Sequence, residues 1–238
     1  MSTITKQQYG ALEETEVSTA VAELSELLGS DDLGVYAQYG SWAIYPKVDT
    51  KPVSAAQDPS TVNTFAAVEG VAHNNVVLVA FNLGRPKNPA QGAEVGQLRH
   101  NKDRLWANFH SGASDYNIAR GTESNAFRGA YITDFFKGLP TNNINEFKFL
   151  MRSRGEAWRS RIEEAMHTVL DRELSLIGAE NSPLVSFGRS TGDENSLLDL
   201  LSGFYGTERV HYVSHYADAV GRNYHEQFEE LEKRLDLG

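Results

Sequence analysis

The stretch VVLVAFNLGRPKNP, residues 76–89, changes character abruptly at its centre. Its first six residues are all apolar, and a polar segment that begins at Asn82 follows them. A continuous apolar run is typical of a strand that is covered on both faces, as in a parallel sheet. Ligands of such sheets bind just outside the carboxyl ends of the strands. The stretch therefore predicts a buried strand over 76–81 that ends at a ligand-binding edge of the sheet, with Asn82 directly after the strand.

Strands and helices alternate regularly after this first strand. Further strands are predicted over residues 129–134, 182–188 and 209–214. The helices predicted between and after the strands cover residues 96–109, 156–178, 193–203 and 218–236. Such alternation is typical of βαβ units. The predicted fold class is therefore α/β: a three-layer α/β/α sandwich with a mostly parallel four-stranded central sheet.

The residues before the first strand show a different pattern. Residues 12–28 carry leucines and valines close to helical spacing and are followed by a glycine, which predicts a helix. Two short aromatic runs around Gly40-Ser41 predict a hairpin over residues 35–46. We therefore expect two parts, an amino-terminal helix and hairpin elaboration over 1–70 and an α/β/α domain over 71–238.

The bulk composition narrows the classes of function. The chain has 238 residues, of which 40% are hydrophobic and none is cysteine, so disulfides, thiol nucleophiles and thiolate metal clusters are excluded. No segment reaches the roughly 18 consecutive apolar residues of a membrane helix, and residues 1–10 lack the apolar core of a signal peptide. We therefore expect a cytoplasmic protein without a membrane partner. The net charge of −10 gives no overall attraction to nucleic acid.

Polar side chains stand at the end of each predicted strand. Asn82 follows the first strand, Asp134 ends the second, Arg189 and Ser190 follow the third, and His215 follows the fourth. Because the carboxyl ends of parallel strands share one edge, we expect these side chains to converge there. The sequence therefore predicts a site that combines an amide, a carboxylate, a hydroxyl and an imidazole.

Four short segments at these strand ends are AFNLG (80–84), AYITDFFKG (130–138), PLVSFGRST (183–191) and SHY (214–216). In order and in strand context they resemble the motifs of the uracil-DNA glycosylase-like superfamily. Those motifs are a Gly-x-Asn-Pro-Gly turn, a Tyr-Ile-Thr-Asn-x-x-Lys segment, a strand that ends in Gly-Arg, and a His-Pro-Ser motif. The resemblance implies an enzyme of base excision that hydrolyses an N-glycosidic bond, with uracil in DNA as the substrate. We expect no cofactor and no metal ion.

The resemblance also implies roles for individual residues. Asn82 corresponds to the residue that positions the hydrolytic water, Asp134 to the asparagine that reads the base edge, and His215 to the histidine that stabilises the departing base. No motif places the aromatic side chain that stacks on the base, for which the candidates are Phe81, Trp106 and Phe109. Phosphate contacts are expected from Arg85, Arg189 and Ser190.

The chain departs from the superfamily pattern at three places. Leu83 stands where the motif has proline, Asp134 where it has asparagine, and Tyr216-Ala217 where it has Pro-Ser. An ionised aspartate offers acceptors only, whereas uracil presents a donor and an acceptor to an asparagine. A protonated Asp134, its pKa raised by burial, would restore the missing donor. The departures support a second hypothesis, in which a diverged protein binds a nucleotide or nucleoside without cleaving it.

Three further interpretations fit some of the same residues. GRSTG (188–192) has the spacing of a hydrolase nucleophile elbow with Ser190 as nucleophile and His215 as base, although only residues 191–238 remain for the strands that such a fold adds. His211 and His215 have a metal-ligand spacing but lie across a strand end rather than on a helix face. Asn82 and Asp134 also suit local turns or helix caps. A basic stretch, interpreted as a solvated helix face rather than a phosphate track, contains Lys148, Arg152, Arg154, Arg159 and Arg161.

Overall fold

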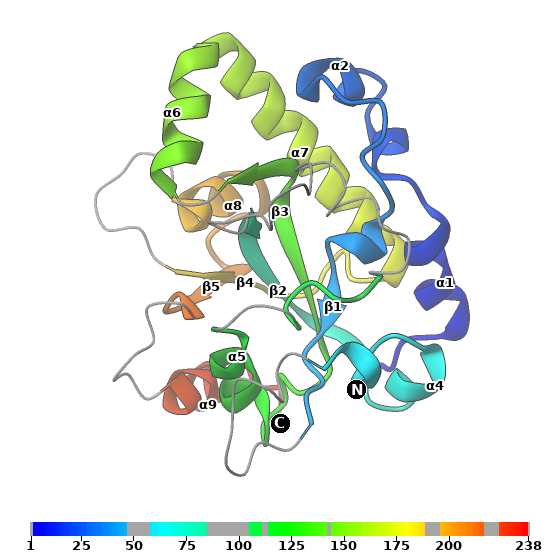
Figure 1. The fold of residues 1–238 in the computed structure, drawn as a ribbon. Helices are drawn as coiled ribbons and strands as arrows, with labels where there is room; N and C mark the ends of the chain where they lie inside the picture. The colour runs from blue at the N-terminus through cyan, green and yellow to red at the C-terminus, as the bar shows by residue number, and fades with distance from the viewer. Residues whose placement is uncertain are drawn as a thin grey trace.

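The computed structural model describes residues 2–46, 58–84, 105–110, 114–141, 144–188, 196–216 and 224–237. Its centre is a five-stranded sheet of order β1-β3-β2-β4-β5 (Figure 1). The strands are β1 (Ser41–Trp42), β2 (His73–Gly84), β3 (Ala130–Thr141), β4 (Leu184–Phe187) and β5 (Val210–Val213). Strands β2 to β5 pair in parallel, and β1 pairs with β3 in the antiparallel direction. The chain thus has a mixed α/β fold with a mostly parallel sheet.

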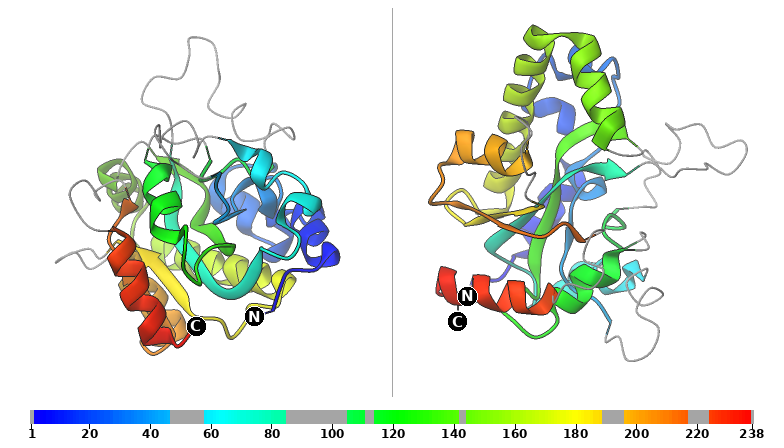
Figure 2. Two further views of the ribbon diagram at one scale, coloured as in Figure 1. Left: turned by 90° about the horizontal axis from the view of Figure 1, so that it is seen from below. Right: turned by 90° about the vertical axis from the view of Figure 1, so that its left-hand side faces the viewer.

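Helices cover both faces of this sheet (Figures 1 and 2). One face carries the amino-terminal helices together with α6 (Ile144–Arg154), α7 (Glu156–Ile177) and α8 (Leu197–Tyr205). On the other face, α5 (Asp115–Thr122) packs along α9 (Tyr224–Leu235). The shorter elements are α1 (Lys6–Glu14), η1 (Val17–Ala20), α2 (Leu24–Leu28), η2 (Tyr36–Gln38), η3 (Pro59–Thr61) and α4 (Phe65–Val68).

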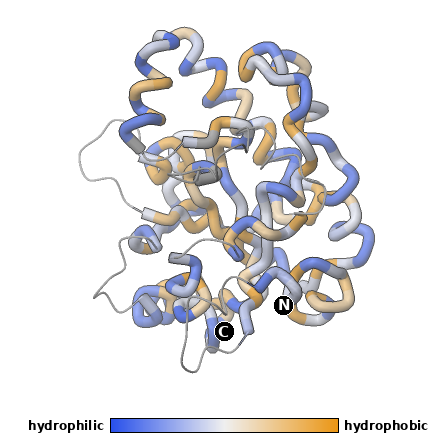
Figure 3. The backbone as a smooth tube through the Cα atoms, viewed as in Figure 1, coloured by the Kyte–Doolittle hydropathy of each residue, from blue (hydrophilic) through white to orange (hydrophobic). Residues whose placement is uncertain are grey.

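The central strand β2 separates two buried cores. Val77 and Val79 belong to the core beneath α7, whereas Val76, Leu78 and Ala80 belong to the core beneath α5 and α9. Successive residues of a strand point to opposite faces, so a strand covered on both faces is apolar at every position. The buried strand predicted over 76–81 is confirmed, and the middle of the sheet is predominantly hydrophobic (Figure 3). Among the described helices, none combines the length and the hydrophobicity that a membrane crossing requires.

The predicted number of four strands is wrong, because the short strand β1 adds a fifth. It pairs with β3, with Trp42 opposite Tyr131, instead of forming the hairpin expected over residues 35–46. A Cβ atom at Gly40 would lie 2.0 Å from the hydroxyl of Tyr131, so glycine is required at this approach. The aromatic run therefore packs onto β3 rather than folding back on itself.

The single helix expected over residues 12–28 is divided into α1, η1 and α2. The interruption contains β-branched residues that disfavour helix, namely Thr15, Val17 and Thr19. The backbone N–H of Val17 donates instead to the carbonyl of Gly34 at 2.9 Å. A tertiary hydrogen bond thus replaces the local helical one. Helix α1 begins earlier than expected, at Lys6, where a capping box stabilises its first turn.

Helices α7, α8 and α9 confirm the helices predicted after the second strand, although residues 193–195 and 218–223 of two of them lie outside the described residues. The prediction of a helix over 96–109 is wrong at its carboxyl-terminal end. Residues 96–104 lie outside the described part, and residues 105–110 form turns. Two residues there have a positive φ, which a right-handed helix excludes.

The described part of residues 1–70 shares a core with the sheet. Leu12, Leu24 and Trp42 belong to the same buried cluster as Val77 of β2. Strand β1 also lies at one end of the sheet, next to β3. The described residues of the amino-terminal elaboration are therefore packed into the main core.

Candidate functional site

The carboxyl ends of the four parallel strands share one edge of the sheet, where β2 to β5 end at Gly84, Thr141, Phe187 and Val213. The expected phosphate contacts, Arg85, Arg189 and Ser190, lie outside the described residues. The described part of the candidate site therefore comes from β3, from the turn at residues 105–110, and from the residues that follow β4 and β5.

Asp134 is a buried carboxyl of β3, seven positions before the strand ends and level with the carboxyl end of β4. It is 1% exposed and stands opposite Ala80 of β2 in the parallel register. Asn108 donates a hydrogen bond of 2.9 Å from Nδ2 to its Oδ2. Burial raises the pKa of Asp134 from 3.8 to about 7, because the loss of hydration outweighs the hydrogen bond from Asn108 and the charge of Lys137. At neutral pH this carboxyl is therefore close to half protonated.

Asn108 is held in place by a strained turn. Its neighbours Trp106 and Phe109 have φ angles of 64° and 65°, left-handed conformations that are costly for bulky side chains. Trp106 is fully buried, and the hydroxyl of Tyr45 donates to the carbonyl of Phe109 at 3.1 Å. The surrounding core thus holds the turn in this conformation. This conformation of the turn places the side-chain amide of Asn108 against the carboxyl of Asp134.

A buried ion pair fixes the end of β3 from the opposite face. Lys137 donates from Nζ to Oε2 of Glu173 at 2.7 Å and to the backbone carbonyl of Asp134 at 2.6 Å. Oε1 of Glu173 accepts from the hydroxyls of Tyr131, at 2.8 Å, and Thr133, at 2.9 Å. The side chains of the pair are fully buried. Every charged group therefore has several partners, as a buried pair requires.

His215 and Tyr216 form an aromatic pair directly after β5. Their rings stack at 4.6 Å with an interplanar angle of 20°. The ring of Tyr216 also lies edge-on to Phe187, at 5.3 Å, and to Phe109, at 6.5 Å. A Cβ atom at Gly188 would lie 3.3 Å from Cβ of His215, so the glycine at the end of β4 lets this histidine approach. The contacts join the ends of β4 and β5 to the turn at 105–110.

The phenol of Tyr216 lies within reach of the charge of two buried carboxyl groups. Burial raises the pKa of the Tyr216 phenol far above its usual value, and the nearby carboxylates of Asp115 and Asp134 raise it further. Asn117 of α5 donates from Nδ2 to the backbone carbonyl of Tyr216 at 2.6 Å. The structure thus places Phe109 and His215 against the ring of Tyr216, and Asp134 near enough for its charge to act on the Tyr216 phenol.

Asn82 uses its amide nitrogen to hold the sheet together. Nδ2 donates to the carbonyl of Leu139 at 2.7 Å and to Oγ1 of Thr141 at 3.0 Å. Asn82 stands opposite Phe136, two positions beyond the pair of Ala80 and Asp134. Its amide therefore joins the end of β2 to the end of β3. Oδ1 has no partner among the described residues.

Of the three candidate stacking aromatics, Phe109 alone lies beside Tyr216. Phe81 points to the opposite face of β2, where its ring packs edge-on against Phe147 at 4.5 Å. The expectation that Phe81 contacts the base site is therefore not met, because it alternates with Ala80 along the strand. Trp106 lies in the amino-terminal core, stacked on Tyr9 at 4.5 Å.

No family model, no curated protein and no solved structure matches the chain. Among the described residues, no group of three or more histidine, aspartate or glutamate side chains is placed to hold a metal ion. The site offers a carboxyl that changes protonation near pH 7, an imidazole fixed against a phenol, and aromatic edges beside them.

Three residues of this region were not predicted from the sequence, namely Asn108, Lys137 and Glu173. The ion pair could have been predicted from the sequence, because Lys137 interrupts an apolar strand and Glu173 occupies a position on the buried stripe of α7. Two opposite charges at core positions indicate a buried pair. Asn108 had no such signal, since its contact depends on two positive φ angles that its sequence does not suggest.

Proposed function

We propose that the carboxyl edge around Asp134 binds a nucleobase, and that the protein hydrolyses an N-glycosidic bond on a three-layer scaffold of the uracil-DNA glycosylase-like type. Uracil is the first base to test. The observation that carries the proposal is Asp134 itself, a buried carboxyl of raised pKa on β3, level with the carboxyl end of the neighbouring parallel strand β4. Strand ends of this kind are where α/β folds bind ligands, and strongly shifted pKa values concentrate at functional sites.

Protonated Asp134 has the hydrogen-bonding pattern that uracil requires. A neutral carboxyl offers one donor and one acceptor, which complement O4 and N3–H of uracil. Because the pKa is about 7, about half of the molecules carry this proton at neutral pH. The bond from Asn108 Nδ2 to Oδ2 orients the carboxyl, and the ring of Phe109 supplies a nearby surface against which a base can pack.

His215 suits the stabilisation of the departing base. Breaking the N-glycosidic bond leaves negative charge on the base, and an imidazole N–H donates to its oxygen. A donor aimed at developing charge contributes roughly 2.7–4 kcal/mol to such a step. Stacking on Tyr216 restricts the plane of the imidazole before the substrate arrives. A base in DNA must leave the helical stack to reach this buried position.

The first test is excision of uracil by the parent protein and by His215 variants. His215→Ala is expected to lower the rate about 100- to 1000-fold, because a donor to the developing anion is lost. His215→Gln, which keeps an N–H donor, should retain more activity than His215→Ala. Product is measured from single-stranded and double-stranded oligonucleotides, and also from deoxyuridine, because the net charge of −10 disfavours DNA. Equal rates for the parent and His215→Ala would remove His215 from the mechanism.

The second test uses Asp134→Asn, which supplies a donor and an acceptor at every pH. At pH 8, a carboxyl with a pKa of about 7 is ionised in roughly nine molecules of ten. Asp134→Asn is therefore expected to raise uracil binding or excision up to about tenfold at pH 8 and to make it less sensitive to pH. Calorimetry and excision assays between pH 6 and 8 measure this. An efficient parent that Asp134→Asn leaves unchanged would show that Asp134 does not read the base.

A second candidate function is nucleoside or nucleotide binding without cleavage. The observation that favours it is the amide of Asn82, whose nitrogen is engaged with Leu139 and Thr141. An asparagine so committed has only Oδ1 for a water molecule, and it cannot remove a proton as a carboxylate can. Binding of deoxyuridine with no release of uracil over long incubations would support this function over hydrolysis.

A further inference from the structure

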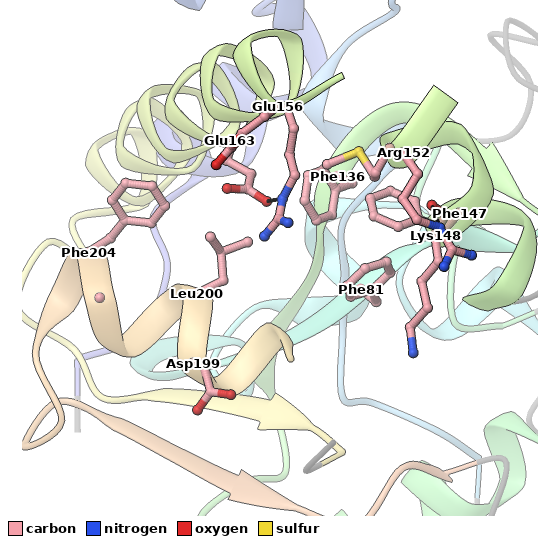
Figure 4. Close-up of a pocket in the computed structure, with 13 residues that line it drawn as sticks. Phe81, Phe136, Phe147, Lys148, Arg152, Glu156, Glu163, Asp199, Leu200 and Phe204 are labelled. Atoms are coloured by element: carbon pink, nitrogen blue, oxygen red, sulfur yellow. Dashed lines mark hydrogen bonds and ion pairs between the residues drawn. The ribbon is translucent and has the colours of Figure 1, made fainter. Parts of the chain in front are cut away.

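A cavity of about 770 Å³ lies on the face of the sheet opposite Ala80 and Asp134 (Figure 4). Its walls come from α6, α7 and α8 and from the ends of β2 and β3. The volume is in the range of cavities that hold small molecules, about 300–1,000 Å³. This cavity is separate from the group around Tyr216, and the proposed function makes no use of it.

Aromatic side chains line the cavity from two sides. Phe81, Phe136 and Phe147 gather on one side, and Phe204 of α8 lies across from them (Figure 4). The rings of the first three pack on one another with centroids 4.5–5.1 Å apart. Phe204 is fixed by stacking on His167 at 4.2 Å. Aromatic walls that are already packed suit a flat apolar ligand, because little side-chain freedom is lost on binding.

Most carboxylates of the lining already have partners. Glu163 forms an ion pair of 2.8 Å with Arg159, and Oδ2 of Asp199 accepts from the hydroxyl of Ser196 at the start of α8. Glu156 stands in the first turn of α7, where the helix dipole favours negative charge. These contacts of Glu163 and Asp199 do not involve Arg152 on the opposite wall.

The basic residues on that wall are Lys148 and Arg152 of α6, which lie beside the phenylalanine group (Figure 4). Arg152 donates from Nε to the backbone carbonyl of Lys148 at 3.2 Å. No carboxylate of the described residues lies within ion-pair distance of its guanidinium group. Three residues of the basic stretch, Lys148, Arg152 and Arg159, thus line a cavity rather than covering a plain solvated face.

We propose that this cavity is a second ligand site, which binds a small molecule with a flat apolar ring system and one anionic group. The ring system would lie between the phenylalanine group and Phe204. The anionic group, a carboxylate, sulfonate or phosphate, would accept hydrogen bonds from the guanidinium group of Arg152. Guanidinium groups bind such anions with directed, charge-assisted hydrogen bonds.

The test uses two fluorescent probes that differ in charge. 1-Anilinonaphthalene-8-sulfonate is a flat aromatic anion, and N-phenyl-1-naphthylamine has the same rings without the sulfonate. The full chain is expected to bind one molecule of either probe. Arg152→Ala should lower the affinity for the anionic probe at least tenfold, and its affinity for the neutral probe should stay within twofold of that of the parent. Arg154→Ala on the same helix, outside the lining, is the matched control and should change neither.

A blocking variant tests the location. Gly203 lines the cavity, and a Cβ atom there has no heavy atom within 4 Å. Gly203→Phe is therefore expected to fold and to abolish binding of both probes. Gly203→Leu serves the same purpose with a smaller side chain. Phe149, 69% exposed on α6 and outside the lining, is the apolar surface residue most open to adventitious probe, and Phe149→Ser should have no effect.

Two outcomes would overturn the proposal. Unchanged binding in both folded Gly203 variants would place the probes elsewhere on the surface. If Arg152→Ala weakens binding of the anionic and neutral probes equally, Arg152 does not recognise the anionic group, and the cavity has no preference for an anionic ligand. Neither readout depends on uracil excision, so this proposal and the proposed function can fail separately.

Discussion

Replacing Lys137 by methionine is expected to lower the free energy of unfolding by about 3–5 kcal/mol. Methionine keeps the apolar stem of lysine but removes the charge that faces Glu173 at 2.7 Å. Glu173 is then a buried carboxylate with only the hydroxyls of Tyr131 and Thr133 as donors. A buried charge without its counterion is much less stable than the pair. Urea denaturation followed by circular dichroism measures the loss.

Two variants control this result. The double variant Lys137→Met/Glu173→Gln should recover most of the loss, because glutamine keeps an acceptor for the two hydroxyls without a charge. Arg161→Ala removes the surface pair of Arg161 with Glu23, whose side chains are 52% and 47% exposed, and should cost less than about 1 kcal/mol. If Lys137→Met costs no more than Arg161→Ala, the buried pair does not hold β3 in the way described.

Asp134→Asn is expected to change how stability depends on pH. The pKa of Asp134 rises from 3.8 to about 7 on folding, so the folded state holds the proton more tightly than the unfolded chain. This stabilisation is fully present below about pH 4 and is lost as the pH rises through about 7. The rise in pKa corresponds to at most roughly 4 kcal/mol. Asparagine has no proton to lose in this range.

Urea denaturation of both proteins at pH 5 and pH 8 measures the difference. Between these values the parent is expected to lose about 2–3 kcal/mol of stability relative to Asp134→Asn. Other titrating groups act equally in both proteins, so the comparison isolates this carboxyl. Parallel pH profiles for the two proteins would mean that Asp134 titrates as an exposed aspartate does.

Strong periodicity made most of the sheet and its later helices predictable. The apolar run at 76–81 and the apolar stripe of α7 reflect burial, which the residues themselves determine. Strand β1 was not predictable in this way, because two residues carry no periodicity and their pairing with Tyr131 is a tertiary contact. The helix expected over 12–28 failed for a related reason, since contacts with distant residues outweighed a weak local preference.

The candidate site was partly predictable because parallel strands end at one edge. That rule alone indicated Asp134 and His215 as neighbours of a common site. It did not indicate that the amide of Asn82 would bind across to the end of β3, because β3 continues well beyond the predicted strand. Nor did it indicate Asn108, which reaches Asp134 across 26 positions of sequence.

Strand β1 has a consequence for the behaviour of the protein at high concentration. It covers the outer edge of β3, where Trp42 is paired with Tyr131 and the carbonyl of Ala130 accepts from the N–H of Ala43. An uncovered edge would present open N–H and C=O groups, a template on which another chain can add a strand. A strand of only two residues is itself too short to serve as such a template. The amino-terminal segment thus shields the stretch of β3 at Tyr131 and Ile132 from strand addition, as well as enlarging the core.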